Sequence, residues 1–377
     1  MKIERYYDNL AKYVKPQKVL VIYGPRRVGK TTLLGDFLAA THFKYKLDSG
    51  DNITTHHVLG SQDFTVLREY AAGYELIAID EAQRIPQVGQ GIKILVDQIN
   101  DMRVIATGSS SFELAGQVGE PLTGRKTMLT LYPVAQMELA VQFNNHELRE
   151  RLPDFLVFGS YPEVLTASSN ADRMRILEEL VNSYLLKDIL ELENVKGPKV
   201  ILDLLRLVAF QVGNEVSLSE LGSQLGIDTK TVARYLDLLE KSFVLFNLRG
   251  FSRNLRKEVT RKSKYFFYDV GIRNAVISNF NQIQERNDVG ALWENFVIVE
   301  RLKRRAYEEI YANQYFWRTW EQREVDFVEE REGKLFGYEC KWGIGGGKHA
   351  AAWRVAYPEA KFAIITKENY LDFVSGR

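Results

Sequence analysis

One stretch, residues 19–34, constrains the fold more than any other part of the sequence. It reads VLVIYGPRRVGKTTLL, an apolar run followed by a glycine-rich turn. The apolar run predicts a buried strand, and the spacing of the leucines that follow predicts an amphipathic helix directly after the turn. Gly24 and Gly29 let the turn fold back, so that its backbone N–H groups and the N-terminus of the helix face an anion. The spacing of glycine, lysine and threonine is typical of a phosphate-binding loop.

The chemistry of the loop predicts a nucleoside triphosphate, ATP, bound with Mg²⁺. We expect Lys30 to contact the β- and γ-phosphates and the hydroxyl of Thr31 to bind Mg²⁺. The full set of expected nucleotide contacts in the loop is Gly24, Pro25, Arg26, Arg27, Val28, Gly29, Lys30, Thr31 and Thr32.

Two further apolar runs end in polar residues. Residues 76–79 are followed by Asp80 and Glu81, and residues 103–106 by Thr107, with Ser109 two positions later. The carboxyl ends of parallel strands meet at one crevice. We therefore expect Asp80 to hold hydrated Mg²⁺, Glu81 to polarise the attacking water, and Thr107 or Ser109 to sense the γ-phosphate. The alternative is that these are ordinary buried strands with solvated ends.

Composition limits the classes of protein. The chain has 377 residues, a net charge of +1 and one cysteine, Cys340. This length suggests two or three domains, and the near-neutral charge means that any surface for nucleic acid must be local. A single cysteine excludes an internal disulfide, and no apolar run is long enough to span a membrane. We expect a cytoplasmic protein that does not enter a membrane.

Strands and helical segments alternate as far as residue 131, which predicts an α/β fold with a parallel sheet. We expect a P-loop ATPase domain at 1–138, a helical lid or connector at 139–207, a winged-helix domain at 208–280 and a C-terminal α/β domain at 281–377. Arg125, just before the last strand of the first domain, is a candidate to stabilise the transition state of hydrolysis, within its own subunit or across a subunit boundary. The alternative is a surface arginine in a loop.

Residues 218–239 read as helix, glycine-containing turn and helix, which resembles the helix-turn-helix of winged-helix domains. The apolar spacing predicts that Thr229, Lys230, Arg234 and Tyr235 lie toward the outside. The segment 249–264 then carries seven basic residues and one acid. This composition predicts a surface for double-stranded DNA. The alternatives are a solvated basic face, or a winged helix that binds a protein partner.

The C-terminal region contains a second group of polar residues. Asp326 lies in one expected strand, Glu339 and Lys341 lie in the next, and Glu294 lies in a preceding amphipathic helix. Carboxylates and a lysine at this spacing are suited to phosphodiester hydrolysis, with Asp326 and Glu339 binding Mg²⁺ and Lys341 orienting the attacking hydroxide. A structural Glu339–Lys341 pair is the alternative.

Together these segments resemble a family of prokaryotic AAA+-superfamily ATPases that join a P-loop domain to a C-terminal domain of unknown function related to restriction-endonuclease-like folds. The resemblance covers nearly the whole chain and rests on GPRRVGKTT (24–32), IDEAQ (79–83), TGSS (107–110), LTGR (122–125), FGSYPE (158–163), YFFYDVG (265–271), WENFV (293–297), WRT (317–319) and EVDFV (324–328). It implies ATP binding, and it implies a PD-(D/E)xK nuclease pattern at Asp326, Glu339 and Lys341.

Two functions follow from these observations. The first is an ATP-dependent DNA-processing enzyme in which the ATPase regulates a nuclease site. The second is a nucleotide-driven switch that binds a protein or DNA partner through a catalytically silent nuclease-like domain. A small-molecule kinase is disfavoured by the long downstream segments. The sequence does not indicate the oligomeric state.

Overall fold

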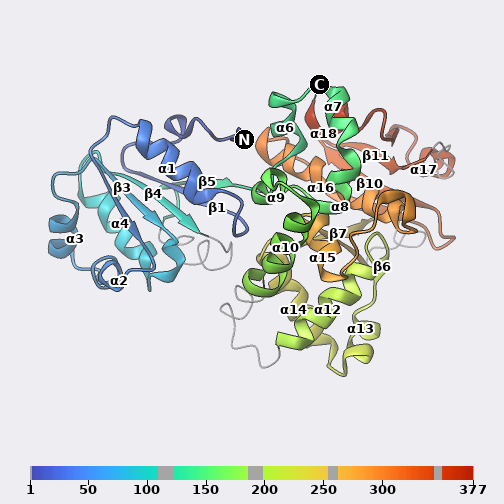
Figure 1. Ribbon diagram of the computed structural model, residues 1–377, viewed down its shortest axis with the longest axis horizontal. Helices are drawn as coiled ribbons and strands as arrows, with labels where there is room; N and C mark the ends of the chain where they lie inside the picture. The colour runs from blue at the N-terminus through green and yellow to red at the C-terminus, as the bar shows by residue number, and fades with distance from the viewer. Residues whose placement is uncertain (1, 109–121, 186–197, 254–261, 344–349, 377) are drawn as a thin grey trace.

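The computed structural model of the protein describes residues 2–108, 122–185, 198–253, 262–343 and 350–376. The chain forms two lobes that lie side by side (Figure 1). We call residues up to 131 the N-terminal lobe and residues from 132 onward the C-terminal lobe. No helix in the described ranges is long and apolar enough to cross a membrane.

The N-terminal lobe is built on a parallel sheet with the strand order β2-β3-β4-β1-β5. Its strands are β1 (Lys18–Tyr23), β2 (Tyr45–Ser49), β3 (Leu76–Asp80), β4 (Arg103–Gly108) and β5 (Lys126–Thr130). Its helical segments are η1 (Leu10–Lys12), α1 (Lys30–Ala40), α2 (Ile53–Leu59), α3 (Phe64–Ala71), η2 (Ala82–Arg84) and α4 (Val88–Gln98). The predicted parallel α/β sheet is confirmed.

Helices cover both faces of this sheet, and the side chains of its strand β1 are apolar on both faces. Leu20 and Ile22 pack in the cluster that includes α1, whereas Val19 and Val21 pack with α2, α3 and α4. A strand buried on both faces reads as a continuous apolar run rather than an alternating one. Burial on both faces explains why the sequence signal at β1 was strong.

The C-terminal lobe begins with helices and ends in a mixed sheet. Its helical segments are α6 (Gln136–Gln142), α7 (Asn145–Glu150), α8 (Leu152–Phe158), α9 (Pro162–Thr166), α10 (Asn170–Glu179), the π-helical η3 (Leu180–Leu185), α12 (Pro198–Phe210), α13 (Leu218–Leu225), α14 (Thr229–Lys241), α15 (Val270–Val276), η4 (Ile283–Glu285), α16 (Val289–Tyr307), α17 (Ala350–Ala356) and α18 (Tyr370–Ser375). Its strands are β6 (Glu215–Val216), β7 (Leu245–Phe251), β8 (Ser263–Phe267), β9 (Asn313–Arg318), β10 (Glu324–Arg331), β11 (Lys334–Cys340) and β12 (Lys361–Ile365).

These strands form one sheet in the order β12-β11-β10-β9-β7-β8-β6. Parallel pairing of β7 with β9 joins the hairpin β7–β8 to the C-terminal strands. Strands from both sides of position 280, where a domain boundary was expected, therefore belong to one continuous sheet. Helix α16 covers one face, where Phe316 and Phe327 pack, and Trp353 of α17 packs against Val325 and Val328 on the other.

The region expected to be a winged helix, residues 208–280, holds the end of α12, then β6, α13, α14, β7, β8 and α15, in that order. Asp228 caps α14 by accepting hydrogen bonds from the N–H groups of Lys230 and Thr231, each 2.9 Å long. Lys230 and Arg234 are exposed, as expected, but Tyr235 is buried. Tyr235 packs in the core because it lies beside Leu236 and one turn before Leu239 on the apolar stripe of the helix.

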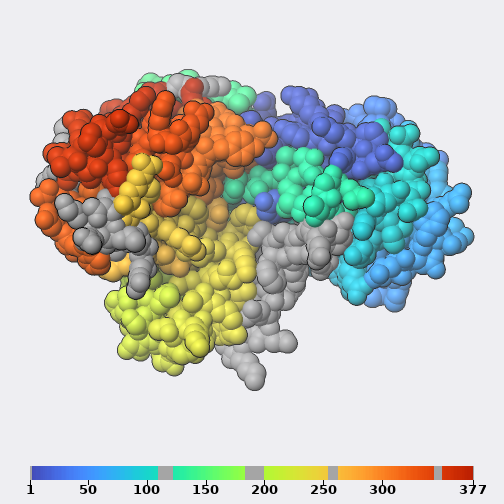
Figure 2. Space-filling model, turned by 180° about the vertical axis from the view of Figure 1, so that it is seen from behind, coloured from blue at the N-terminus to red at the C-terminus, as the bar shows by residue number. Residues whose placement is uncertain are grey.

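The lobes meet along the N-terminal residues and the link from β5 to α6. In Figure 2 the N-terminal residues, in dark blue, lie against the orange part of the C-terminal lobe. The ring of Tyr6 stacks on that of Tyr307 of α16, with the centroids 4.9 Å apart. In the link, the N–H of Val134 donates to the carbonyl of Ser160, 2.9 Å away.

Candidate active site

The phosphate-binding loop connects β1 to α1 and requires glycine at two positions. Gly24 has a φ of +150°, and a Cβ there would lie 2.0 Å from the carbonyl oxygen of Leu131. Gly29 has a φ of +96° and is the N-cap of α1. Side chains disfavour these conformations, and at Gly24 one would also collide with the chain that leaves β5.

Lys30 is buried at the start of α1, with 5% of its surface exposed. Its ammonium donates to the carbonyls of Gly24 and Pro25, at 2.9 and 2.6 Å. Lysine has three N–H donors, and both of these acceptors are neutral. Phosphate oxygens are stronger acceptors, so a bound nucleotide would draw the ammonium toward itself.

Thr31 and Asp80 lie together, as the sequence predicted. The Thr31 hydroxyl donates to Asp80 Oδ2 over 2.9 Å, and the Thr107 hydroxyl donates to Asp80 Oδ1. Hydroxyl and carboxylate oxygens are the hard donors that Mg²⁺ prefers, so this pair fits a nucleotide-bound Mg²⁺. Held by Thr31 and Asp80, Mg²⁺ would supply positive charge to neutralise the phosphates of ATP.

Thr107 does not face the crevice, which differs from the expectation that it senses the γ-phosphate. It is fully buried, and besides bonding Asp80 its oxygen accepts the N–H of Glu81 at 3.1 Å. Thr107 therefore positions the two acids. The other expected sensor, Ser109, lies outside the described residues.

Glu81 follows Asp80 in a left-handed conformation with a φ of +52°. Such a conformation is uncommon for a residue with a side chain and concentrates at functional sites. The Gln83 amide donates to Glu81 Oε2 at 2.7 Å, and Arg84 Nε lies 4.0 Å from the same oxygen. These neighbours orient the carboxylate that the sequence assigns to the attacking water.

The crevice in front of the loop has a volume of about 520 Å³. Its lining residues are Arg26, Arg27, Gly29, Lys30, Thr31, Thr32, Asp51, Glu81, Arg84, Pro162 and Glu163. Asp51 and Arg84, which form an ion pair, were not predicted, although Arg84 is only three residues after Glu81. Pro162 and Glu163 were not predicted either, because they come from α9 of the other lobe.

Arg27 connects the phosphate loop to the C-terminal lobe. It has a φ of +58°, and its guanidinium lies 3.1 Å from Glu163 of α9 and 2.8 Å from Glu179 of α10. The arginine side chain is 26% exposed and the two glutamates about half exposed. The crevice therefore holds a loop cation, Arg27, and one of these acids, Glu163.

Arg125 is not in the crevice of its own subunit. Its carbonyl accepts the N–H of Val19, at the start of β1, and its side chain pairs with Asp97. Because β1 and β5 are parallel, Arg125 lies beside the N-terminal end of β1, whereas the phosphate-binding loop follows the C-terminal end. These two ends are roughly 17 Å apart along the strand. A catalytic role for Arg125 within its own subunit is excluded by this arrangement.

In the C-terminal lobe, three acids surround Lys264 of β8, whose side chain is 1% exposed. Its ammonium lies 3.2 Å from Glu294 of α16 and also bonds Glu324 of β10. Asp326 completes the group and accepts the N–H of Cys340 at 2.7 Å. Lys264 and Glu324 were not predicted as members of this cluster. Lys264 was instead assigned to the DNA-binding stripe, and its burial among acids shows that it cannot contact a phosphate backbone.

Burial dominates the protonation of this acidic cluster. It raises the pKa of Glu294 to about 8 despite the neighbouring ammonium, and it raises the pKa of Asp326. Burial disfavours the charge of Lys264 too, yet Glu294 and Glu324 raise its pKa. The cluster is thus held together by one lysine charge shared among several carboxyl groups.

Glu339 and Lys341 do not join the acidic cluster. A β-bulge in β10 lies between Val325 and Val328, whose side chains both face α17. The two residues inside the bulge, Asp326 and Phe327, both face α16. Glu339 alternates with Cys340 and therefore points toward α17, where Lys341 Nζ lies 2.8 Å from its Oε1. Of the four residues expected to hydrolyse phosphodiesters, the structure places Glu294 and Asp326 in the acidic cluster and pairs Glu339 with Lys341 outside it.

This arrangement does not fit the expected C-terminal metal site. Asp326 and Glu339 face opposite sides of the sheet, and Lys264 neutralises the acids that remain together. In the described part of the chain, no three His, Cys, Asp or Glu side chains are arranged as metal ligands.

The basic stripe at 249–264 is largely paired where it is described. Arg253 lies 2.8 Å from Glu330, and Lys262 lies 2.6 Å from Glu215. Arg249 is exposed. Arg256, Lys257 and Arg261 lie outside the described residues. The described part of the stripe therefore offers less free positive charge than its composition suggested.

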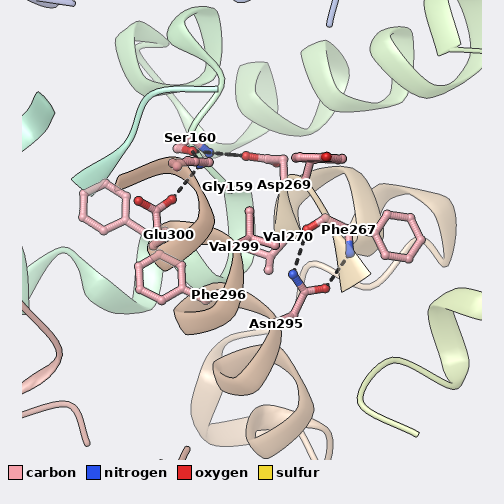
Figure 3. A pocket seen from close by; sticks show the side chains of 12 residues that line it. Gly159, Ser160, Phe267, Asp269, Val270, Asn295, Phe296, Val299 and Glu300 are labelled. Atoms are coloured by element: carbon pink, nitrogen blue, oxygen red, sulfur yellow. Dashed lines mark hydrogen bonds and ion pairs between the residues drawn. The ribbon is translucent and has the colours of Figure 1, made fainter. Parts of the chain in front are cut away.

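A buried polar network joins the turn before α9 to α16 (Figure 3). Asp269 accepts the N–H of Ser160 at 2.7 Å and caps α15 through the N–H of Ile272 at 3.2 Å. Lys303 of α16 bonds Glu300 at 2.6 Å and the Ser160 hydroxyl at 3.3 Å. Burial raises the pKa of both Asp269 and Glu300. This network fixes the turn that carries α9 and hence Glu163.

Comparison with known proteins divides the chain into three parts. Residues 16–140 match a family model described as an AAA domain. Residues 149–283 and 289–372 match two domains of unknown function, DUF8612 and DUF4143. The N-terminal lobe is therefore an AAA-type P-loop ATPase domain, as the sequence predicted, and the comparisons do not confirm a restriction-endonuclease-like fold.

Similar proteins occur in bacteria and archaea. An uncharacterized protein of Mycobacterium tuberculosis is 28% identical over 330 residues, covering 86% of this chain and 70% of its own length. One from Haemophilus influenzae is 23% identical, covering 92% of this chain and 88% of its own, and one from Methanocaldococcus jannaschii is 24% identical, covering 86% and 75%.

Among solved structures, the RuvB Holliday junction branch migration motor of Thermotoga maritima is 17% identical and has a TM-score of 0.29, covering 63% of this chain and 83% of its own. A likeness at this level supports no inference about the present chain.

Proposed function

We propose that this protein is an ATP-driven switch. The N-terminal lobe binds and hydrolyses Mg-ATP, and the nucleotide sets how the C-terminal lobe is held, and with it the affinity for a macromolecular partner. The observation that carries the proposal is the contact of Arg27, inside the phosphate loop, with Glu163 and Glu179 of the other lobe.

Each residue of the ATP site has a separate task in this proposal. Lys30 exchanges two loop carbonyls for phosphate oxygens, and Thr31 with Asp80 holds Mg²⁺. Glu81, held by Gln83, accepts hydrogen bonding from the attacking water and orients it. Thr107 holds the carboxylate of Asp80 and the backbone of Glu81 in fixed positions relative to each other.

The charges in the crevice explain how ATP would act on the other lobe. Half-exposed ion pairs each stabilise by only about 0.2–1 kcal/mol, so the hold of Arg27 on α9 and α10 is weak. The phosphates of ATP attract Arg27 and repel Glu163, which lines the same cavity. Both effects separate the phosphate loop from α9, and loss of the γ-phosphate reduces them.

The C-terminal lobe acts in this proposal as a binding platform. Lys264 occupies the centre of the acidic cluster, and Glu339 points to the other face of the sheet. Removing one member of this buried cluster of carboxyl groups around a lysine would leave an uncompensated charge at the junction of α16, β8 and β10, which indicates a structural role. We therefore assign no cleavage step to Glu294, Asp326, Glu339 and Lys341.

The ATP site is tested by calorimetry with Mg-ATP. Lys30→Ala should abolish measurable binding, and Glu81→Gln should retain binding but lose most of the hydrolysis rate. Lys18→Ala is the matched control, since Lys18 is a lysine of the same lobe at the opposite edge of the sheet. Wild-type affinity in Lys30→Ala would show that the site is assigned wrongly.

The switch is tested by hydrogen exchange at residues 162–179. In Glu81→Gln, which retains ATP, these amides should exchange faster with ATP than with ADP. The double variant Glu163→Gln/Glu179→Gln should exchange fast with either nucleotide. Arg173→Gln, which breaks the 2.9 Å pair between Arg173 of α10 and Asp154 of α8, is the control and should keep the nucleotide dependence. Identical exchange with ATP and ADP in Glu81→Gln would refute the switch.

Double-stranded DNA is the partner that we propose for this platform. Lys230 and Arg234 lie exposed on the N-terminal half of α14, beyond the capped turn after α13. DNA affinity should then fall steeply with salt and drop in Lys230→Ala/Arg234→Ala. If duplex binding is absent or insensitive to salt, the partner is not DNA, and the same surface would bind a protein.

A further inference from the structure

We propose that Arg5, in the segment before β1, is a positioning residue of the phosphate-binding loop. It holds one peptide group of the loop in the orientation that binds phosphate, and it ties that peptide to the C-terminal lobe. The inference rests on the proposed ATP site and adds a residue outside the predicted nucleotide contacts.

The guanidinium of Arg5 is the centre of a buried hydrogen-bond network. Its side chain is 7% exposed. It donates to the carbonyl of Val28 inside the loop and to the carbonyl of Tyr132, 2.7 Å away, where the chain leaves β5. Its Nε donates to Glu138 of α6 over 2.9 Å. One side chain thus contacts the loop, the link between the lobes and the first helix of the C-terminal lobe.

The bond to Val28 fixes the direction of the next amide. In a planar trans peptide, the C=O and the following N–H point in opposite directions. Because the Val28 carbonyl points toward Arg5, the N–H of Gly29 points away from Arg5. Gly29 lines the crevice, whereas Arg5 is not among its lining residues. Arg5 therefore directs a loop N–H toward the site where the phosphates bind.

Glycine at position 29 makes this anchor necessary. Gly29 has a φ of +96°. A glycine beside a peptide group allows that peptide group to adopt many orientations. A Cβ at Gly29 would lie 3.6 Å from the guanidinium of Arg5, which shows how closely the two approach. Without the arginine, the Val28–Gly29 peptide has no side chain to select its binding orientation among the described contacts.

Glu138 holds Arg5 and makes the network a link between the lobes. Its side chain is 1% exposed, and it also accepts the N–H of Tyr6 at 2.8 Å and the N–H of Ala135 at 2.7 Å. Burial disfavours the charge on Arg5, yet the Glu138 carboxylate raises the pKa of Arg5, so the ion pair persists. A shift of α6 would therefore move Arg5 and the loop peptide together.

The test compares Arg5→Lys with wild type by calorimetry with ADP. The three acceptors lie at three different nitrogens of the guanidinium fork, so the single ammonium group of a lysine cannot reach all of them. ADP affinity should fall roughly tenfold, the size of one impaired hydrogen bond to a charged group, and KM for ATP should rise more than kcat falls. Arg301→Lys is the matched control, because Arg301 is 5% exposed, pairs with Glu329 at 2.8 Å and donates to the carbonyl of Phe373 at 3.0 Å.

The outcomes separate this inference from the proposed function. Weaker ADP binding in Arg5→Lys but not in Arg301→Lys, at a similar loss of melting temperature, supports the positioning role. Unchanged ADP affinity in Arg5→Lys, or an equal loss in Arg301→Lys, overturns it while leaving the ATP site intact. Failure of the wild type to bind ADP refutes the ATP site and the inference with it.

A second variant guards against misfolding of Arg5→Lys. Glu138→Gln keeps the shape of the side chain and weakens the hold on Arg5, together with one of the two backbone bonds that Glu138 accepts from Tyr6 and Ala135. It should also reduce ADP affinity, and wild-type affinity in a folded Glu138→Gln would count against the link to α6. If Arg5→Lys does not fold, this result decides the proposal.

Discussion

Replacing Gly159 by alanine is expected to destabilise the C-terminal lobe by roughly 3 to 6 kcal/mol. Gly159 ends α8 with a φ of +71° and a ψ of −155°, a conformation that is almost exclusive to glycine. A Cβ there would lie 2.0 Å from Oδ1 of Asp269, which is buried and cannot be displaced into solvent. The substitution therefore strains the backbone and expels a capping carboxylate.

Two contributions give this magnitude. The backbone conformation costs about 1–3 kcal/mol for a residue with a side chain. Moving Asp269 breaks one of its two bonds to the N–H groups of Ser160 and Ile272, and one buried hydrogen bond to a charged group contributes about 1.5–3 kcal/mol. At 2–4 °C per kcal/mol, the lobe should melt about 10 °C lower or more.

Tryptophan fluorescence isolates the affected lobe. The chain has five tryptophans, at positions 293, 317, 320, 342 and 353, all in the C-terminal lobe. Gly333→Ala is the matched control, because Gly333 has a φ of +75° but a Cβ there would meet nothing within 4 Å. Gly333→Ala should lose only about 1 kcal/mol, or about 3 °C.

The comparison gives a sharp result. If Gly159→Ala melts no lower than Gly333→Ala, the contact with Asp269 does not constrain the turn, and the buried network in Figure 3 is not what fixes α9. The midpoint by tryptophan fluorescence should also shift more than the circular-dichroism signal of the whole chain, because only one lobe is affected.

Three further predictions concern the two sites. Burial raises the pKa of Glu294 from 4.5 to about 8, so the folded protein keeps a proton that the unfolded chain releases, and stability should fall as the pH rises from about 4.5 to 8. Glu294→Gln should flatten this dependence in urea titrations at several pH values, and an equally steep fall in the variant would assign it to other groups. Arg125→Ala should leave ATP affinity of the isolated subunit unchanged, since Arg125 pairs with Asp97 at the far edge of the sheet; a loss measured by calorimetry at low protein concentration would contradict that placement. Gly24→Ala should abolish nucleotide binding because its Cβ would lie 2.0 Å from the Leu131 carbonyl, and a variant that still binds ATP normally would show that the loop can yield.

The sequence predicted the N-terminal lobe well because its signals are local. An apolar strand, two glycines and Lys30 fall within sixteen residues, and their spacing alone specifies strand, turn and helix. Asp80 was predicted to approach Thr31 because the carboxyl ends of parallel strands share one edge of a sheet. The parallel sheet was predicted correctly; no strand order was predicted, since strand order depends on contacts between distant segments.

The sequence was misleading in the C-terminal sheet, where one extra backbone residue reverses the face of the sheet on which the neighbouring side chains lie. In the C-terminal sheet, simple alternation predicted that Asp326 and Glu339 meet, but the bulge before Val328 turns Asp326 toward α16. No residue in β10 marks this bulge in the sequence. The same reasoning assigned Lys264 to a basic surface, because a run of basic residues gives no sign of which member is enclosed by acids.

By itself the sequence determined the fold class, the phosphate loop and the acids that follow the third strand, because short-range spacing sets backbone conformation. Only the tertiary structure decided the partners of Arg5 and Arg27, which lie 133 residues from Glu138 and 136 residues from Glu163 in the chain. Contacts over such separations depend on how two separately packed lobes come together. A single sequence carries no periodic signal for that association, because it is set by the shape and charge of surfaces that form only after each lobe has folded.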